Sequence, residues 1–149
     1  MPLDAAFVGD DEFIYRRIPV STGWYDPAAA EPASPRAFQP HPENDPEGLS
    51  VSRAKSEEHP DFPSLGEASL GPSRHGYFVA VLRVGDLRQR GIDVVADPLE
   101  ENPGHALIPD LTSGNRNSAG TWELMSILAD ELTLRVEGPF HVADESPTD

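Results

Sequence analysis

Two adjacent arginines, Arg16 and Arg17, stand in the segment EFIYRRI (12–18), in which Phe13, Tyr15 and Arg17 alternate with Ile14, Arg16 and Ile18. Alternation is typical of a strand, so the two side chains point to opposite faces of a sheet and one of them approaches the interior. An inward guanidinium is costly without a partner. We therefore expect an ion pair with Glu137, Asp86 or another acid. The alternative is an anion clamp that holds a phosphate or a carboxylate.

Two histidines precede apolar segments, His75 in SRHGYF and His105 in NPGHALIP. If the two segments are neighbouring strands, both imidazoles face one cavity as an acid and a base, as in the cleavage of phosphodiesters. The alternative is that each histidine bonds a backbone carbonyl and supports the fold. The sequence has no HExxH or comparable spacing, so we expect no bound metal ion.

The segment GLSVSRA (48–54) places Ser50 and Ser52 on one face of a strand and Leu49 and Val51 on the other. In order along the chain, Arg16, Ser50 and Glu137 resemble the arginine, serine and glutamate with which ADP-ribosyltransferase-like folds hold a nicotinamide dinucleotide. The chain departs from that pattern, because it has no serine-threonine-serine motif and no paired acid before Glu137. Arg135 has the same two interpretations as Arg16, an ion pair or an anion clamp.

The turn Asn102-Pro103-Gly104 directly precedes His105, and Pro109 ends the segment that follows. A turn with so many specifying residues fixes local geometry. Its role is either packing or the orientation of His105 and Asn115-Arg116 toward a pocket.

Composition excludes several functional classes. The formal charge is −15, from 11 Lys and Arg against 26 Asp and Glu, which disfavours non-specific binding of nucleic acid. There is no cysteine, so disulfides, thiolate metal sites and cysteine nucleophiles are excluded. We find no glycine-rich phosphate loop, GxSxG elbow or dinucleotide fingerprint, and expect no cofactor. No apolar stretch is long enough for a membrane span, and the acidic N-terminus is unlike a signal peptide, so we expect a cytoplasmic protein without a membrane partner.

The length of 149 residues predicts a single domain over 1–149. Ten of the 16 prolines lie between residues 19 and 73, where they prevent long regular elements. We predict an irregular loop layer there, held by apolar anchors, with a disordered linker as the alternative. The ends, 1–11 and 141–149, are expected to fray.

The remaining segments predict an α+β domain with a mixed or antiparallel sheet of five or six short strands. Alternating or continuous apolar residues indicate strands, expected at 12–18, 48–54, 76–84, 92–96, 105–108 and 132–138. Residues 121–132 carry apolar side chains at helical spacing and predict one long C-terminal helix, with Ser118 or Thr121 as its cap. Asp86 is expected to cap a short helix that Gly91 ends.

Several sequence blocks resemble a family of small standalone bacterial proteins that has no established activity. They are, in order, YRRIP, GLSVSRA, YFVAVLRVGDLR, NPGHA and LRVEGPF, and they extend from about Phe13 to Phe140. The resemblance implies a single-domain bacterial protein and identifies no catalytic residue.

Taken together, these features favour an acidic protein that binds a macromolecular partner, with a protein as the expected partner and a small anion as a further ligand. Acidic inhibitors bind basic enzymes by electrostatic complementarity, so an accessory or immunity-type role in a conflict or defence locus is our interpretation. One alternative is an enzyme for a phosphorylated or nucleotide substrate, with five residues around one cleft. These candidates are Arg16, Ser50, His75, His105 and Glu137. Another is a purely structural subunit with an apolar patch around Trp24-Tyr25 or Trp122.

Overall fold

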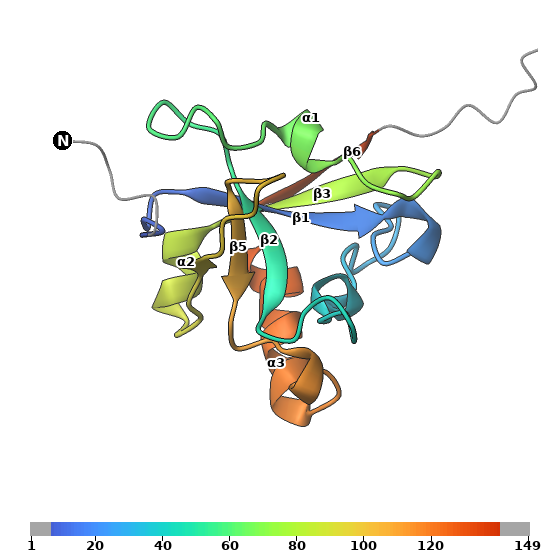
Figure 1. Ribbon diagram of the computed structural model, residues 1–149. Coiled ribbons are helices and arrows are strands. Elements are labelled where there is room, and N and C mark those ends of the chain that lie inside the picture. Colours follow the sequence, from blue (N-terminus) through green and yellow to red (C-terminus); the bar gives the residue numbers. More distant parts are fainter. Residues whose placement is uncertain (1–6, 141–149) are drawn as a thin grey trace, which may run out of the picture.

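The computed structural model describes residues 7–140, which form one six-stranded sheet with short helices packed around it (Figure 1). The strands are β1 (Phe13–Pro19), β2 (Leu49–Arg53), β3 (Tyr77–Arg83), β4 (Val95–Ala96), β5 (His105–Ile108) and β6 (Arg135–Phe140). Their order is β4-β5-β2-β1-β3-β6, and every neighbouring pair is antiparallel. The expected α+β class is confirmed, and the sheet is antiparallel rather than mixed.

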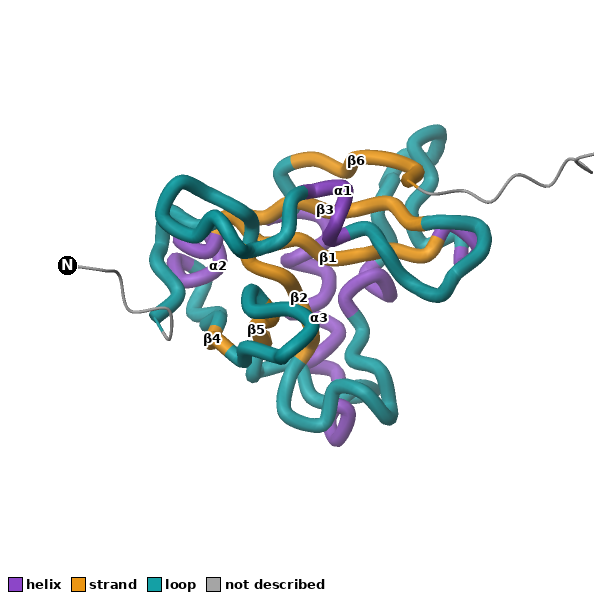
Figure 2. The backbone as a smooth tube through the Cα atoms, turned by 45° about the horizontal axis from the view of Figure 1, so that its top comes forward, coloured by secondary structure: helices purple, strands orange, loops and turns teal. Residues whose placement is uncertain are grey.

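The helical segments are short and lie between the strands along the chain. They are η1 (Val20–Thr22), η2 (Pro35–Phe38), α1 (Leu65–Ala68), α2 (Val84–Gln89), η3 (Ser113–Asn115), α3 (Ala119–Ile127) and η4 (Leu128–Leu132). Figure 1 shows α1 and α3 on opposite sides of β1 and β3. Figure 2 shows that long loops make up much of the chain between these elements, as the proline content of its first half predicts.

Strand β3 confirms the prediction from the continuous apolar run at 76–84. It pairs with β1 along its whole length and with β6 on its other side. Val79, Ala80 and Leu82 have no exposed surface, so side chains on both faces of the strand are covered. β-branched and aromatic residues suit such a position, because they pack well on a pleated surface.

The main core lies between one face of the sheet and the C-terminal helical segment. Ile14 and Ile18 of β1 point to this face and are fully buried, together with Met125 and Leu128. Tyr15 and Arg17 point to the other face, because successive side chains in a strand alternate. The loops around α1 pack on that second face, where Arg17 donates a hydrogen bond to the Leu70 carbonyl.

The predicted C-terminal helix exists but is not long. Helix α3 has 9 residues and continues into η4, a π-helical turn of 5, which makes 14 in all. The helix begins at Ala119, because the Ser118 side chain accepts a hydrogen bond from the Thr121 backbone. It ends where the backbone and hydroxyl of Thr133 both donate to the Leu128 carbonyl.

Helix α2 begins earlier than predicted, and Asp86 lies in its first turn rather than at its cap. The backbone groups of Val84 and Gly85 donate instead to the carbonyls of Glu12 and Asp10. These bonds satisfy helix N–H groups that have no partner within the helix. Gly91 has a φ of 77° and follows the helix, in agreement with the predicted left-handed end.

Two strands differ from their predicted bounds. Strand β4 has only two residues, because the Ile92 N–H still bonds the Leu87 carbonyl and belongs to the end of α2. Strand β6 begins later than predicted, since Leu132 is helical, and it runs through Gly138 and Pro139 instead of stopping there. It reaches Phe140, which pairs with Tyr77 after a shift in register.

The segment before β1 is part of the packed body, because the Val8 side chain is buried in the main core. The segment 19–73 contains β2 and three short helices, and Phe38 and Phe62 anchor it in the interior. The other residues for which fraying was predicted, 1–6 and 141–149, lie outside the described part. No helix within 7–140 is both long and apolar enough to cross a membrane.

Candidate functional site

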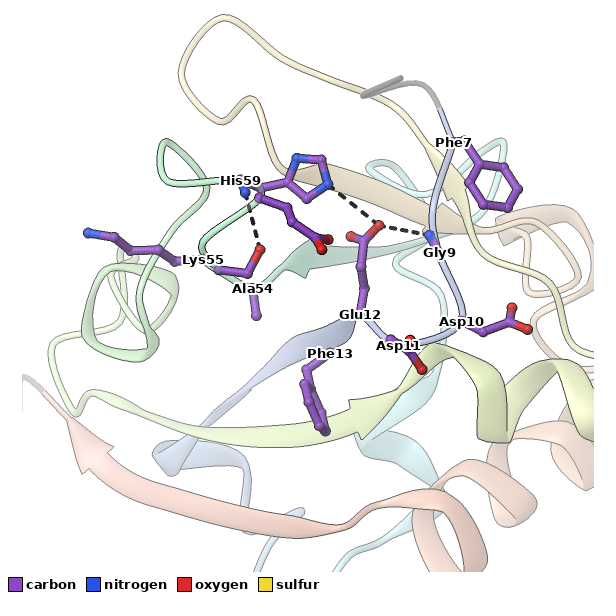
Figure 3. Close-up of a pocket in the computed structure, with 11 residues that line it drawn as sticks. Phe7, Gly9, Asp10, Asp11, Glu12, Phe13, Ala54, Lys55 and His59 are labelled. Atoms are coloured by element: carbon purple, nitrogen blue, oxygen red, sulfur yellow. Dashed lines mark hydrogen bonds and ion pairs between the residues drawn. The ribbon is translucent and has the colours of Figure 1, made fainter. Parts of the chain in front are cut away.

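A cleft of about 590 Å³ opens between the segment that enters β1 and the loop that leaves β2 (Figure 3). Its walls come from two stretches of chain. They are Phe7, Gly9, Asp10, Asp11, Glu12 and Phe13 on one side and Ala54, Lys55, Ser56, Glu58 and His59 on the other. The two stretches are held together because the Ala54 N–H donates to the Phe13 carbonyl.

Glu12 forms the floor of the cleft together with Arg53 behind it. The Nε of Arg53 lies 2.7 Å from Oε1 of Glu12, and its second terminal nitrogen lies 2.7 Å from Oε2. The Gly9 N–H also donates to Oε2, at 2.7 Å. Arg53 is only 1% exposed and Glu12 11%. This two-point geometry is the strongest form of a carboxylate-guanidinium pair.

The charge of Glu12 is fixed by these contacts. Burial acts to raise the pKa of Glu12, but the hydrogen bonds from Arg53 and Gly9 and the positive charge of Arg53 outweigh it. The pKa of this carboxyl therefore lies below its ordinary value. A carboxylate held in this way is a poor proton acceptor, so Glu12 is not suited to be a general base.

His59 lies above the ion pair and closes one side of the cleft. Its Nε2 is 3.8 Å from Oε2 of Glu12, and the two groups face each other in Figure 3. The imidazole stacks on the Phe62 ring, with centroids 4.4 Å apart. The guanidinium of Arg53 also lies on this ring, 4.6 Å from its centroid. Phe62 thus packs against both the imidazole and the guanidinium.

The rim of the cleft combines paired charges with exposed aromatic rings. Asp10 binds Arg88 at 2.7 Å and Asp11 binds Arg83 at 2.9 Å, so both acids are neutralised locally. Phe7 is 65% exposed and Phe13 is 41% exposed. Within residues 7–140 these are the two aromatic side chains that count as exposed, and both line this cleft.

The two acids named as partners of Arg16, Glu137 and Asp86, both pair elsewhere, so that part of the prediction is wrong. Glu137 pairs with Arg135 at 2.7 Å, and Asp86 pairs with Arg83. Arg16 instead donates to the backbone carbonyls of Ala37 and Ser50, each at 3.0 Å. These bonds hold the loop before β2 against β1 and engage two of the five N–H donors of the guanidinium.

Burial lowers the pKa of Arg16 to about 10, although the nearby carboxylate of Asp45 acts to raise it. Asp45 is itself buried and accepts hydrogen bonds from the backbone and the hydroxyl of Ser50. The side chains of Arg16 and Ser50 are therefore both held by contacts that support the fold.

The sheet separates Glu137 from Arg16. Arg16 pairs in register with Ala80 of β3, whereas Glu137 pairs with Val79. Adjacent positions on a strand point to opposite faces, so Arg16 and Glu137 lie on opposite sides of the sheet. The arrangement of ADP-ribosyltransferase-like folds is thus not assembled among Arg16, Ser50 and Glu137.

The strands that follow His75 and His105 are not neighbours, because β2 and β1 lie between β3 and β5. His105 pairs with Ser52, which pairs with Tyr15, whereas His75 lies beyond the pair of Tyr77 with Pro19. At about 3.3 Å per residue, these positions are about 13 Å apart along β1 alone. The two imidazoles do not share a site.

His105 has other neighbours, which sequence reasoning had not connected with it. Its Nδ1 lies 3.0 Å from the backbone oxygen of Asp97 and 3.1 Å from the Oδ2 of that residue. Asn115 and Arg116 are not directed toward His105. Asn115 caps a turn through Thr112, and Arg116 donates to the Pro40 carbonyl.

The cleft residues Glu12, Arg53 and His59 were not predicted as a site. Arg53 carried a usable signal, because it lies in the alternation that places Leu49 and Val51 inside, and it is therefore an inward arginine. Glu12 and His59 carried none, since nothing in their spacing connects two residues on separate loops. Among residues 7–140, no three histidine, aspartate or glutamate side chains are arranged to hold a metal ion.

The chain was compared with protein-family models, with curated proteins and with solved structures, and none of these comparisons gave a match. The resemblance to small bacterial proteins remains an expectation from the sequence.

Proposed function

We propose that this chain binds a basic protein partner and that the cleft between residues 7–13 and 54–59 receives an apolar side chain of that partner. The observation that carries the proposal is the position of Phe7 and Phe13. They are the exposed aromatic rings of the described chain, and both border a cavity large enough for a side chain. Exposed apolar groups around a concavity are typical of interaction sites.

The charge of the molecule supports a basic partner. A net charge of −15 attracts a positively charged protein over long distances and raises its rate of association. The local contribution is different, because Asp10, Asp11 and Glu12 already have arginine partners. We therefore expect the overall charge to speed the approach of the basic partner, and the apolar contact at the cleft to supply most of the binding energy. An accessory or immunity-type protein that blocks a basic enzyme would act in this way.

The alternative of an enzyme built on the five predicted residues receives no support from their placement. Arg16 and Ser50 are engaged in backbone and structural contacts, and Glu137 lies on the opposite face of the sheet from Arg16. His75 precedes β3 and His105 begins β5, and these two strands are not adjacent. A purely structural role through an apolar patch is also less favoured. Tyr25 packs on Phe78, and Arg36 covers the Trp122 ring.

The proposal is tested with three synthetic peptides and the ¹⁵N-labelled protein. The first, Ac-Arg-Arg-Trp-Arg-Arg-NH2, combines charge with an apolar side chain. The second replaces tryptophan by serine, and the third replaces every arginine by glutamate. We expect amide shifts centred on residues 7–13 and 54–59 with the first peptide, weaker binding of the second and none of the third.

Substitution of the cleft completes the test. Phe13→Ala should weaken the binding of the first peptide by about tenfold, because loss of an aromatic anchor costs about 1–2 kcal/mol of binding free energy. Leu134→Ala is the matched control, because Leu134 is an exposed apolar side chain outside the cleft. Equal binding of the tryptophan and serine peptides, or shifts spread over the whole acidic surface, would contradict the proposal.

A further inference from the structure

Ser52 and His105 face each other across β2 and β5, away from the cleft. The next pair along these strands, Arg53 and Gly104, is joined by a backbone hydrogen bond of 2.7 Å. Since the two kinds of pair alternate in an antiparallel ladder, Ser52 and His105 form a non-hydrogen-bonded pair. The Cβ atoms of such pairs are about 4.5–5.5 Å apart, a separation that the hydroxyl of one residue and the imidazole of the other can span.

The proton on the His105 ring is placed by Asp97. Nδ1 of His105 faces two oxygens of Asp97, one from the backbone and one from the carboxylate, and both are acceptors. Nδ1 must therefore carry the hydrogen in the neutral ring, and Nε2 is the unprotonated nitrogen. The His105 side chain is 15% exposed, so small reagents can reach it.

Asn102 supplies an oriented amide beside Ser52. Its Oδ1 accepts a hydrogen bond from the Gly104 N–H at 3.0 Å, which fixes the direction of the amide. Its Nδ2 donates to the Ser52 hydroxyl, also at 3.0 Å. The Ser52 hydroxyl accepts this bond and retains its own hydrogen for a base. The amide has a second hydrogen that can stabilise negative charge on a substrate oxygen.

We infer that Ser52 is a nucleophile for acyl transfer, with His105 as its general base. Asp97 is a positioning residue that holds the imidazole in the required tautomer. Asn102 donates a hydrogen bond to the carbonyl oxygen of the substrate, where negative charge develops. The turn at 102–104 brings these groups together, which explains why its sequence is so closely specified. Asp97, Glu100 and Glu101 surround this turn and repel anions, so the substrate class is neutral or cationic esters.

The reaction balances without any further cofactor. The Ser52 oxygen bonds to the ester carbonyl carbon while its proton moves to Nε2 of His105. The carbon-oxygen bond to the alcohol then breaks, and the alcohol leaves with the proton from His105. Water, deprotonated by the same nitrogen, attacks the acyl group and releases a carboxylic acid and free Ser52.

The inference is tested by reaction of the full chain with an uncharged fluorophosphonate. Attack by Ser52 on phosphorus expels fluoride and leaves a stable adduct, which intact mass and peptide mapping locate. We expect one adduct, on Ser52. His105→Gln should lower the rate of its formation by about 100-fold or more, as expected for loss of a general base. An unlabelled wild-type chain, or an adduct on another residue, would overturn the inference.

Two controls separate chemistry from folding. Ser50→Ala removes a hydroxyl from the same strand and face, and this variant should be labelled at the wild-type rate. Asp97→Ala should slow labelling and Asp97→Glu should restore most of the rate, with thermal unfolding recorded for each variant. The ¹⁵N shifts of the neutral His105 ring should show hydrogen on Nδ1. Hydrogen on Nε2, or labelling unaffected by His105→Gln, would refute the assigned roles.

Discussion

Glu12 and Arg53 meet through two hydrogen bonds of 2.7 Å, one to each carboxylate oxygen, beneath the cleft. The two residues are 41 positions apart in the sequence, and Arg53 is fully buried whereas Glu12 reaches the cleft. Their strands are paired, because Ile14 lies opposite Arg53. This ion pair therefore ties the entrance of β1 to the end of β2 and fixes the shape of the cleft between them.

Removal of one partner from this pair should destabilise the protein strongly. Glu12→Gln leaves the buried guanidinium without a counter-charge, and breaking a buried pair in this way costs about 3–5 kcal/mol. Urea denaturation at pH 7 measures the change in the free energy of unfolding. Asp11→Asn is the matched control, since Asp11 is 98% exposed and solvent screens its pair with Arg83, so this variant should be nearly as stable as the wild type. Similar losses for both variants would contradict the structural role of Glu12.

The contribution of Glu12 should depend on pH in one direction. Its pKa in the folded protein is lowered from an ordinary value of 4.5, so the carboxylate form is favoured by folding. The stabilisation is complete above that value and is lost as the pH falls through the lower folded pKa. We expect the difference between wild type and Glu12→Gln to be constant from pH 7 to about 6 and to shrink from pH 5 to 3. Urea titrations at these pH values test this, and a difference that grows in acid would contradict it.

Arg16 should matter for stability and not for anion binding. Arg16→Met removes the donors to the Ala37 and Ser50 carbonyls, and each unsatisfied buried carbonyl costs about 1–3 kcal/mol. Arg74→Met makes the same exchange at an exposed position and should be nearly neutral. Denaturation of the two variants measures this contrast. Titration of the wild type with inorganic phosphate should show no saturable shift of the amide signals near Arg16. A saturable shift there would support the interpretation of Arg16 as an anion clamp.

The elements of this fold were largely predictable because their patterns are local. The apolar run of β3, the alternation in β2 and the Ser118 cap each depend only on residues that are close together in the sequence. The early start of α2 was not predictable, because its N–H groups are satisfied by Asp10 and Glu12, far away in the sequence. The end of β6 was missed for a similar reason, since a pair with Tyr77 extends it.

The site was harder to predict than the fold. That one arginine of the first strand points inward follows from alternation, but its partners are carbonyl oxygens, which any residue supplies. Sequence composition therefore does not identify them. His105 was singled out correctly as a residue at a strand start, yet its neighbours Ser52 and Asp97 depend on which strands are adjacent. Strand order is a property of the whole chain, and no local pattern contains it.

Gly104, the glycine of the turn that precedes β5, should not tolerate a larger residue. A Cβ at this position would lie 3.0 Å from the Arg53 carbonyl oxygen and 3.0 Å from Cδ of Pro63. Neither a backbone atom nor a proline ring moves easily, so Gly104→Ala should cost about 1–3 kcal/mol of unfolding free energy. The displaced turn should also weaken the hydrogen bond from Asn102 to Ser52. Gly120→Ala is the matched control, because a Cβ there meets nothing within 4 Å and alanine favours the helix by about 0.5–1 kcal/mol. Thermal unfolding of the two variants should show opposite shifts, and a Gly104→Ala protein as stable as the wild type would show that the turn is not closely packed.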